Sequence, residues 1–304
     1  MLGPPPAIPG NLLDGYVTDG QTRFKSNSYA AFGEATWHAA GRLDVTGGLR
    51  YTVEDKHGRF DSTVAGGLAI TSATLNNSKL SILRPQSYSA SDSDSSPSGR
   101  INASYNVSAG VLAYAGYSRG SKSGGINMSG LPLNAANLPA LATAVIKPEK
   151  NTTVEIGLKT RTLNQRLLVN LDVYDTTVRD FQTNVVDTGP GALRGYLANI
   201  DKVRVRGAEL EAALKLSQHW SGHVSSSWAD GKYVSDANGP CPLELIGNAT
   251  TVCDLSGRPL TALPKWVASA ATVWSMPASD SAAWVPGSSL PGRGICSIAT
   301  ICRT

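Results

Sequence analysis

The amino-acid sequence predicts an all-β protein, an antiparallel transmembrane β-barrel for which this chain supplies an incomplete set of strands. Three observations support this fold class. Apolar and polar residues alternate with a period of two, the connections between strands alternate between short and long, and aromatic residues lie near the strand ends. Because side chains alternate between the two faces of a strand, a period of two indicates one apolar face and one polar face.

The clearest alternation lies in residues 42–54. One face is apolar and carries Leu43, Val45, Gly47, Leu49, Tyr51 and Val53. The opposite face is polar and carries Arg42, Asp44, Thr46, Gly48, Arg50, Thr52 and Glu54. Many apolar positions elsewhere are Ala or Gly, and the chain has only 4 Phe residues. A sandwich core of two interdigitating faces needs larger side chains, so a single layer of strands around a polar interior is favoured.

The pattern predicts nine long strands in meander order, near residues 27–38, 42–56, 98–108, 111–120, 149–161, 166–182, 196–216, 220–234 and 262–276. Short turns are expected at 39–41, 109–110, 162–165 and 217–219, and long loops at 57–97, 121–148, 183–195 and 235–261. Outer-membrane barrels have short turns on the periplasmic side and long loops outside. A soluble sandwich has no reason to sort its loops in this way.

Aromatic residues support a membrane location. Tyr29 and Trp37 are eight residues apart on one face. This separation spans roughly 20 Å of bilayer at a rise of about 3.3 Å per residue and a tilt near 40°. The spacing fits two aromatic girdles, although aromatic pairs across the strands of a soluble sheet would also explain it. The parity of the loops favours the membrane.

Composition narrows the function classes. Hydrophobic residues make up 41% of the chain and charged residues only 16%, and the net charge of +4 comes without a basic run, so no nucleic-acid partner is indicated. The four histidines are scattered, and no nucleophile elbow or phosphate loop is present. We therefore predict no enzyme activity, no catalytic residues, no metal site and no cofactor. The start of the chain shows no signal peptide, so either the protein is not exported or its true start lies elsewhere.

The cysteines predict one disulfide. Cys241 and Cys253 are 12 residues apart in the 235–261 loop, which the topology places outside the cell. A protein that passes through the oxidising periplasm can form this bridge, which would contribute about 3 kcal/mol. Cys296 and Cys302 lie in the last segment and are assigned no role.

Four ordered segments resemble the barrel half of TonB-dependent outer-membrane receptors. Residues 117–127 resemble Y-S-R-G-x-K-S-G-G-x-N, and residues 147–159 resemble K-P-E followed by E-x-G-x-K. Residues 206–211 resemble R-G-x-E-x-E, and residues 259–265 resemble P-x…P-K. The matching positions are Arg119, Gly120, Lys122, Gly124, Gly125, Lys147, Pro148, Glu149, Glu155, Gly157, Gly207, Glu209, Glu211, Pro264 and Lys265. Pro148 and Pro264 come just before strands, where a missing N–H is tolerated.

The resemblance implies a barrel of about 22 strands, and an outer-membrane location in a Gram-negative bacterium. It also implies uptake of an iron–siderophore or a similar scarce ligand, driven by the TonB complex through a plug domain that this chain lacks. Ligand contacts would come from the long loops at 57–97, 121–148, 183–195 and 235–261. Glu209 and Glu211 are expected to project into the lumen, where a merely solvated face is the alternative to a ligand role.

We expect three regions: an irregular segment at 1–20, the partial barrel at 21–277, and an aberrant tail at 278–304 produced by a frameshift or truncation. In the tail the alternation is lost among Pro286, Gly287, Pro291, Gly292 and Gly294. Three alternatives remain open for the function. The chain could be a non-functional fragment, a passive porin or a soluble β-sandwich binding module.

Overall fold

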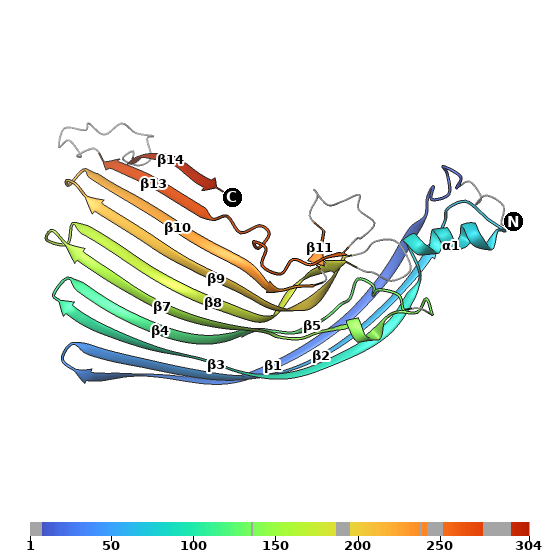
Figure 1. Cartoon of the computed structure of the whole chain (residues 1–304), viewed down its shortest axis with the longest axis horizontal. Helices are drawn as coiled ribbons and strands as arrows, with labels where there is room; N and C mark the ends of the chain where they lie inside the picture. The colour runs from blue at the N-terminus through green and yellow to red at the C-terminus, as the bar shows by residue number, and fades with distance from the viewer. Residues whose placement is uncertain are drawn as a thin grey trace, which may run out of the picture.

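A computed structural model describes residues 8–134, 136–186, 195–237, 239–241, 252–275 and 293–303. Within these residues ten antiparallel strands form one sheet in the order β1-β2-β3-β4-β7-β8-β9-β10-β13-β14. Each strand therefore pairs with the neighbouring long strand along the chain, as a meander requires. Figure 1 shows the sheet curving like a trough, which is the form expected for part of a barrel wall. The strands are β1 (Val17–Ala40), β2 (Leu43–Ala65), β3 (Gln86–Ser108), β4 (Val111–Lys122), β7 (Glu149–Thr162), β8 (Leu167–Val186), β9 (Gly195–Lys215), β10 (Trp220–Ser235), β13 (Trp266–Ser275) and β14 (Arg293–Arg303).

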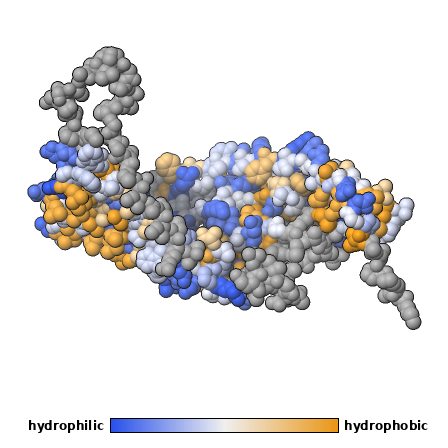
Figure 2. All heavy atoms as spheres, turned by 90° about the horizontal axis from the view of Figure 1, so that it is seen from above, coloured by the Kyte–Doolittle hydropathy of each residue, from blue (hydrophilic) through white to orange (hydrophobic). Residues whose placement is uncertain are grey.

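The four short turns lie at one end of the sheet, and the long connections from β2 to β3, β4 to β7, β8 to β9 and β10 to β13 join the strands at the other end (Figure 1). The turns join β1 to β2, β3 to β4, β7 to β8, and β9 to β10, so the predicted parity of the connections is confirmed. In Figure 2, hydrophobic residues gather toward the end with the short turns, hydrophilic residues follow toward the middle of the molecule, and smaller hydrophobic patches lie among polar residues toward the opposite end. This distribution fits an apolar belt near the short turns. Among the described residues, no helix is long and apolar enough to cross a bilayer.

Several strands are longer than predicted. The predicted loop 57–97 contains the ends of β2 and β3, and only residues 66–85 connect them, with α1 (Ala73–Ile82) between. Likewise β1 begins at Val17, inside the segment expected to be irregular, and β8 and β9 extend into the predicted loop 183–195. Residues 187–194 of that loop lie outside the described residues. The alternation of hydrophobicity fades above the membrane because both faces become polar there, although the backbone ladder continues.

The other two long loops contain short strands. The loop at 121–148 holds β5 (Gly125–Ile126), the 3-10 helix η1 (Leu141–Thr143) and β6 (Val145–Ile146), which pairs with β5. The loop at 235–261 holds β11 (Gly239–Pro240) paired with β12 (Val252–Cys253). Residues 238 and 242–251 of the second loop lie outside the described residues.

The strand β14 was not expected, because the sequence after residue 278 loses its alternation. In the structure, residues 293–303 pair antiparallel with β13, with a register shift between Ala268 and Ala270. Backbone groups can pair along the free edge of β13 whatever the side-chain pattern of the incoming strand, which is why the missing alternation did not exclude a strand. Residues 276–292 and 304 lie outside the described residues. A frameshift or truncation as the origin of this tail stays a prediction.

Buried side chains gather at the end of the sheet with the long connections, in two clusters. The first contains Phe60, Tyr88, Leu131 and Ala144. The second contains Val185, Ile200, Val203, Tyr233 and Leu255. Each cluster forms where a long loop packs against the strands.

Candidate functional site

The upper part of β2 shows which face of the sheet the 121–148 loop covers. Lys56, Gly58 and Phe60 are buried, whereas His57 and Arg59 between them are exposed. By strand alternation the buried positions share a face with Arg50, Thr52 and Glu54, the face predicted to be polar. Met128 lies against Gly58, since a Cβ built there would meet the Met128 side chain. The loop therefore folds inward over the lumen face of the sheet.

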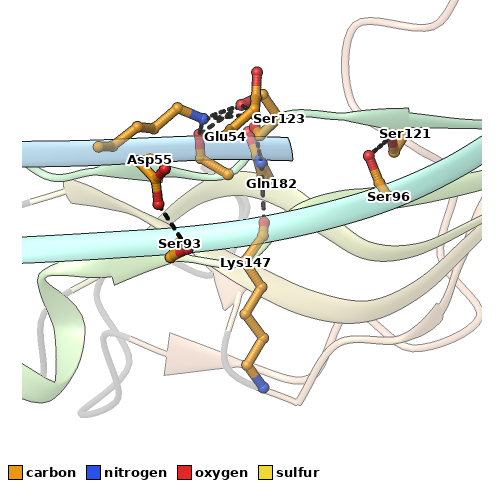
Figure 3. Close-up of polar contacts among 10 residues, drawn as sticks. Glu54, Asp55, Ser93, Ser96, Ser121, Ser123, Lys147 and Gln182 are labelled. Carbon is orange, nitrogen blue, oxygen red and sulfur yellow. Dashed lines mark hydrogen bonds and ion pairs between the residues drawn. The ribbon is translucent and has the colours of Figure 1, made fainter. Parts of the chain in front are cut away.

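Lys56 holds the start of this loop. Its side chain is only 7% exposed, and its ammonium donates hydrogen bonds to Glu54 Oε2 at 2.9 Å and to the Gly124 carbonyl at 2.7 Å. The Ser123 hydroxyl contacts both Lys56 Nζ and Glu54 Oε2 (Figure 3). The Ser123 hydroxyl, together with Lys56, holds the pKa of the Glu54 carboxyl below its ordinary value of 4.5. We call Glu54, Lys56, Ser123 and Gly124 the lysine junction.

Asp92 lies directly opposite Lys56 on β3. Burial raises the pKa of the Asp92 carboxyl, and the nearby Lys56 charge opposes that rise. At Gly124, a Cβ would stand 2.5 Å from the Ile146 carbonyl oxygen, 3.1 Å from Asp92 Oδ2 and 3.2 Å from Pro148 Cδ. A side chain has no room at this position, which explains a glycine here in physical terms.

Glu149 and Gln182 hold the end of the loop. Glu149 Oε1 accepts a hydrogen bond from the backbone N–H of Gln182 at 2.7 Å. The same oxygen forms an ion pair with Lys122 Nζ at 3.3 Å. The Gln182 side-chain amide donates to the carbonyls of Ser123 at 2.9 Å and Lys147 at 3.0 Å (Figure 3). One side chain of β8 thus bridges the two ends of the loop. The motif positions Lys122, Gly124, Lys147 and Glu149 are brought together here.

Three further polar side chains fix the middle of the loop. The Asn127 amide donates to the carbonyls of Thr143 and Leu197, both at 2.8 Å. Tyr88 donates its hydroxyl hydrogen to the Asn127 carbonyl at 2.7 Å. Gln86 exchanges two hydrogen bonds with the backbone of Leu131, whose side chain is 1% exposed. Because these groups are buried and paired, displacing the loop would leave several polar groups unsatisfied.

The second loop packs on β8, β9 and β10. Val203 and Leu255 are buried with Tyr233, and Cys253 packs against the same cluster. A disulfide joins Cys241 to Cys253 with their Cα atoms 4.9 Å apart. Pro264 and Lys265 directly precede β13, and the Lys265 carbonyl accepts a hydrogen bond from the backbone N–H of Ala229 at 3.0 Å.

The motif positions on β7 surround one tyrosine of β4. Tyr114 lies directly opposite Gly157, and its hydroxyl donates to Glu155 Oε1 at 2.5 Å. Lys159 Nζ stands 5.3 Å from the centre of the Tyr114 ring. A Cβ on Gly157 would lie 2.5–2.6 Å from three atoms of Tyr114. The pattern E-x-G-x-K therefore forms a seat for an aromatic ring, with the glycine below it and a charged group at each end.

The same arrangement recurs on β9. Gly207 lies opposite Tyr174 of β8, whose ring would collide with a Cβ on Gly207. Glu209 lies opposite Asp172, and Glu211 accepts a hydrogen bond from the Asn170 amide at 3.0 Å. By strand alternation Glu209 and Glu211 share the face of Gly207, which is the lumen face.

Two motif positions on β4, Arg119 and Gly120, lie apart from these groups. Arg119 lies opposite Thr152, on the outward face, and does not join the lumen residues. Gly120 lies against Asn151, whose Oδ1 would stand 2.6 Å from a Cβ at this position. Lys56, Gln86, Tyr88 and Gln182 were missed by the sequence reasoning, although continuing the alternation of β2 upward would have placed Lys56 in the lumen. No group of residues suited to a metal ion occurs in the described part of the chain.

The meander sheet, its apolar belt, its polar lumen face and its inward-folded loops define a class of protein, the transmembrane β-barrels of the bacterial outer membrane. The profile of the family described as "TonB dependent receptor-like, beta-barrel" matches residues 3–293. The chain belongs to this family.

The named relatives are receptors. The chain is 22% identical over 232 residues to proteins named "Pesticin receptor" from Yersinia enterocolitica and Yersinia pestis. The match covers 76% of this chain and 29% of those relatives, so the chain spans less than a third of their length.

Solved structures share the fold. The ferric yersiniabactin uptake receptor FyuA from Yersinia pestis superposes with a TM-score of 0.62 at 18% identity, covering 85% of this chain and 33% of that one. The siderophore receptor PiuA from Acinetobacter baumannii gives 0.57 at 16% identity over 83% and 32% of the two chains. The copper transporter OprC gives 0.55 at 21% identity over 82% and 32%.

Proposed function

We propose that the complete protein containing these strands imports a ferric siderophore across the outer membrane, with energy supplied by the TonB complex through a plug domain. The observation that carries this proposal is the pair of long loops folded over the lumen face. A loop held in the lumen by buried hydrogen bonds suits a gated receptor, whereas a passive pore needs an open channel. The proposal assigns no catalytic step to the chain.

The choice of a ferric siderophore rests on the names of the relatives, which include a ferric yersiniabactin uptake receptor and a siderophore receptor. A copper transporter of the same fold shows that the ligand class varies among similar barrels. The ligand would meet the loops at 57–97, 121–148, 183–195 and 235–261.

Uptake of ⁵⁵Fe by cells that lack the intact gene tests the proposal. Ferric complexes with phenolate, catecholate and hydroxamate chelators are supplied one at a time, with heme and cobalamin as competing classes. We expect uptake of one ferric complex to be lost, and to return with the gene unless a protonophore is present. Loss of cobalamin or heme uptake alone would overturn the siderophore assignment. Uptake that resists the protonophore would indicate a passive porin.

We further propose that the ten-stranded sheet does not transport by itself. Its first and last strands, β1 and β14, each have one unpaired edge within the described residues. In hydrocarbon each unsatisfied backbone group costs several kcal/mol, so these edges require further strands to pair with. Producing the 304-residue chain alone in the deletion strain tests this. Restored ⁵⁵Fe uptake by that chain would contradict it.

A further inference from the structure

The outward face above the apolar belt carries a row of basic side chains. Lys150 on β7 lies directly opposite Arg179 on β8, and Arg179 lies directly opposite Lys202 on β9. Arg204 and Arg206 follow on β9 toward the short turns. Arg204 lies opposite Thr177, and Arg206 lies opposite Asp175. We call Lys150, Arg179, Lys202, Arg204 and Arg206 the cationic patch.

The register places this patch on the convex, lipid side of the sheet. Residues directly opposite one another share a face, and the same rows continue downward to Ile156 opposite Val173 and to Val173 opposite Ala208. Ile156 and Val173 are 58% and 52% exposed, as expected for side chains that meet lipid rather than a packed core. Val203, the next residue toward the short turns, points the other way and is buried under the 235–261 loop. The alternation ends above Lys202, because Ile200 is buried in the same cluster as Val203.

The depth of the patch matches the lipid headgroups. Arg206 lies at the edge of the apolar belt. Lys150, Arg179 and Lys202 lie four to six residues farther toward the long loops than Val154, Val173 and Ala208, respectively. At about 3.3 Å per residue and a tilt near 40°, these residues stand roughly 10–15 Å above the belt. The flexible stems of Lys and Arg can carry their charges back toward the hydrocarbon edge. A bulky sugar-phosphate headgroup spans this range of depth.

The five basic side chains of the patch outnumber the nearby carboxylates, which are Asp175 on the same face and Asp180 and Asp201 next to Arg179 and Lys202 along their strands. Asp175 accepts hydrogen bonds from Arg204 Nε at 2.8 Å and from Arg206 Nε at 3.1 Å. Lys150, Arg179 and Lys202 form no ion pair with any residue in the described part of the chain. The neighbouring Asp230 and Lys232 pair with each other at 2.9 Å and add no net charge. Like charges directly opposite across strands destabilise a sheet unless an anion lies between them.

We propose that the cationic patch binds the phosphate groups of a phosphorylated glycolipid in the outer leaflet of the outer membrane. Arg and Lys are the side chains that bind phosphate, and a row of three across neighbouring strands can contact one diphosphorylated headgroup. The lipid would hold this part of the barrel wall at a defined depth. The proposal depends on the membrane topology and not on which ligand the receptor imports, so a failed uptake experiment leaves it standing.

Binding of diphosphoryl lipid A to the detergent-purified protein, assembled by the cell, tests the proposal. The test compares the unaltered protein with a triple variant that combines Lys150→Gln, Arg179→Gln and Lys202→Gln. We expect its affinity to fall on the order of 100-fold, because each basic residue near an anionic lipid surface contributes a factor of about five. A matched variant, Arg42→Gln with Arg161→Gln and Lys215→Gln, removes the same charge near the short turns and should bind like the unaltered protein.

Two further measurements keep the test decisive if the triple variant assembles poorly. A charge-conserving variant, Lys150→Arg with Arg179→Lys and Lys202→Arg, should retain lipid A binding. The unaltered protein should bind dephosphorylated lipid A at least tenfold more weakly than the diphosphoryl form. Equal binding of the two lipid forms would overturn the proposal, as would undiminished binding by an assembled triple glutamine variant.

Discussion

The seat of Tyr114 allows a quantitative prediction for the substitution Gly157→Ala. The new Cβ would lie 2.5 Å from the Tyr114 ring, whereas ordinary contacts begin near 3.4 Å, so the ring must move by about 1 Å. That movement strains or breaks the 2.5 Å hydrogen bond to Glu155 and the ring contact with Lys159. The hydrogen bond to a charged group is worth about 1.5–3 kcal/mol, and the ring contact about 0.5–1 kcal/mol.

Replacing Gly by Ala also reduces the entropy of the unfolded chain, which offsets about 0.4–1 kcal/mol of this loss. We therefore expect Gly157→Ala to destabilise the barrel by about 1–3 kcal/mol. Urea unfolding of the protein in lipid vesicles, followed by tryptophan fluorescence, measures this free energy.

A control substitution and a second background separate the ring contact from a general effect of alanine. Gly47→Ala is the matched control, because no atom lies within 4 Å of a Cβ built at Gly47. Its effect should stay within about 0.5 kcal/mol. In a Tyr114→Ala background, Gly157→Ala should become neutral or stabilising. An equal loss in the presence and absence of the Tyr114 ring would show that contact with the ring is not the cause.

The remaining predictions concern the two inward-folded loops. Lys56→Met should speed proteolysis of the 121–148 loop on intact cells about tenfold, since it removes the Lys56 hydrogen bonds to Glu54 and to the Gly124 carbonyl at a cost of about 1–3 kcal/mol. Lys25→Met, at an exposed position on β1, is its control, and equal cleavage of the two variants would argue against the lysine junction. The same loop should loosen in acid: the lowered pKa of Glu54 contributes stability that is complete above the ordinary value of 4.5 and is lost as pH falls through the folded-state pKa. Cleavage that does not change between pH 6 and pH 3 would contradict this. Cys241→Ser should lower the stability of the 235–261 loop by about 3 kcal/mol in the chain-entropy estimate. Thiol titration of the unfolded, unreduced protein checks the bridge, because reactive thiols at Cys241 and Cys253 would exclude it.

The membrane-spanning parts of the strands were predictable because lipid and water face opposite sides of one layer. In β2 this contrast produces a period of two from Leu43 to Val53, and the prediction of a strand there is confirmed. Above the membrane the contrast disappears. Residues 87–96 of β3 are all Ser, Asp, Tyr or Ala, so the sequence was interpreted as a loop although the ladder continues from Gln86.

The polar residues that hold the loops were harder to predict, for a different reason. Lys56 meets Gly124 across 68 positions of sequence, and Gln86 meets Leu131 across 45. Such contacts depend on the register of several strands and on a loop that turns inward, and no local pattern encodes them. The motif glycines were noticed only by resemblance, and the structure supplies their physical reason in Tyr114 and Tyr174.

The sheet forms a membrane wall with lipid on one face and the lumen on the other. A scan of single spin labels along residues 44–53 of β2, in the protein held in lipid vesicles, tests it most directly. Labels at Val45, Gly47, Leu49, Tyr51 and Val53 should collide with dissolved oxygen, and labels at Asp44, Thr46, Gly48, Arg50 and Thr52 with a water-soluble nickel complex. Accessibility to the two reagents that rises and falls with a period of two is the predicted result. Uniform exposure of both sets to the nickel complex would show that the sheet does not separate lipid from the lumen.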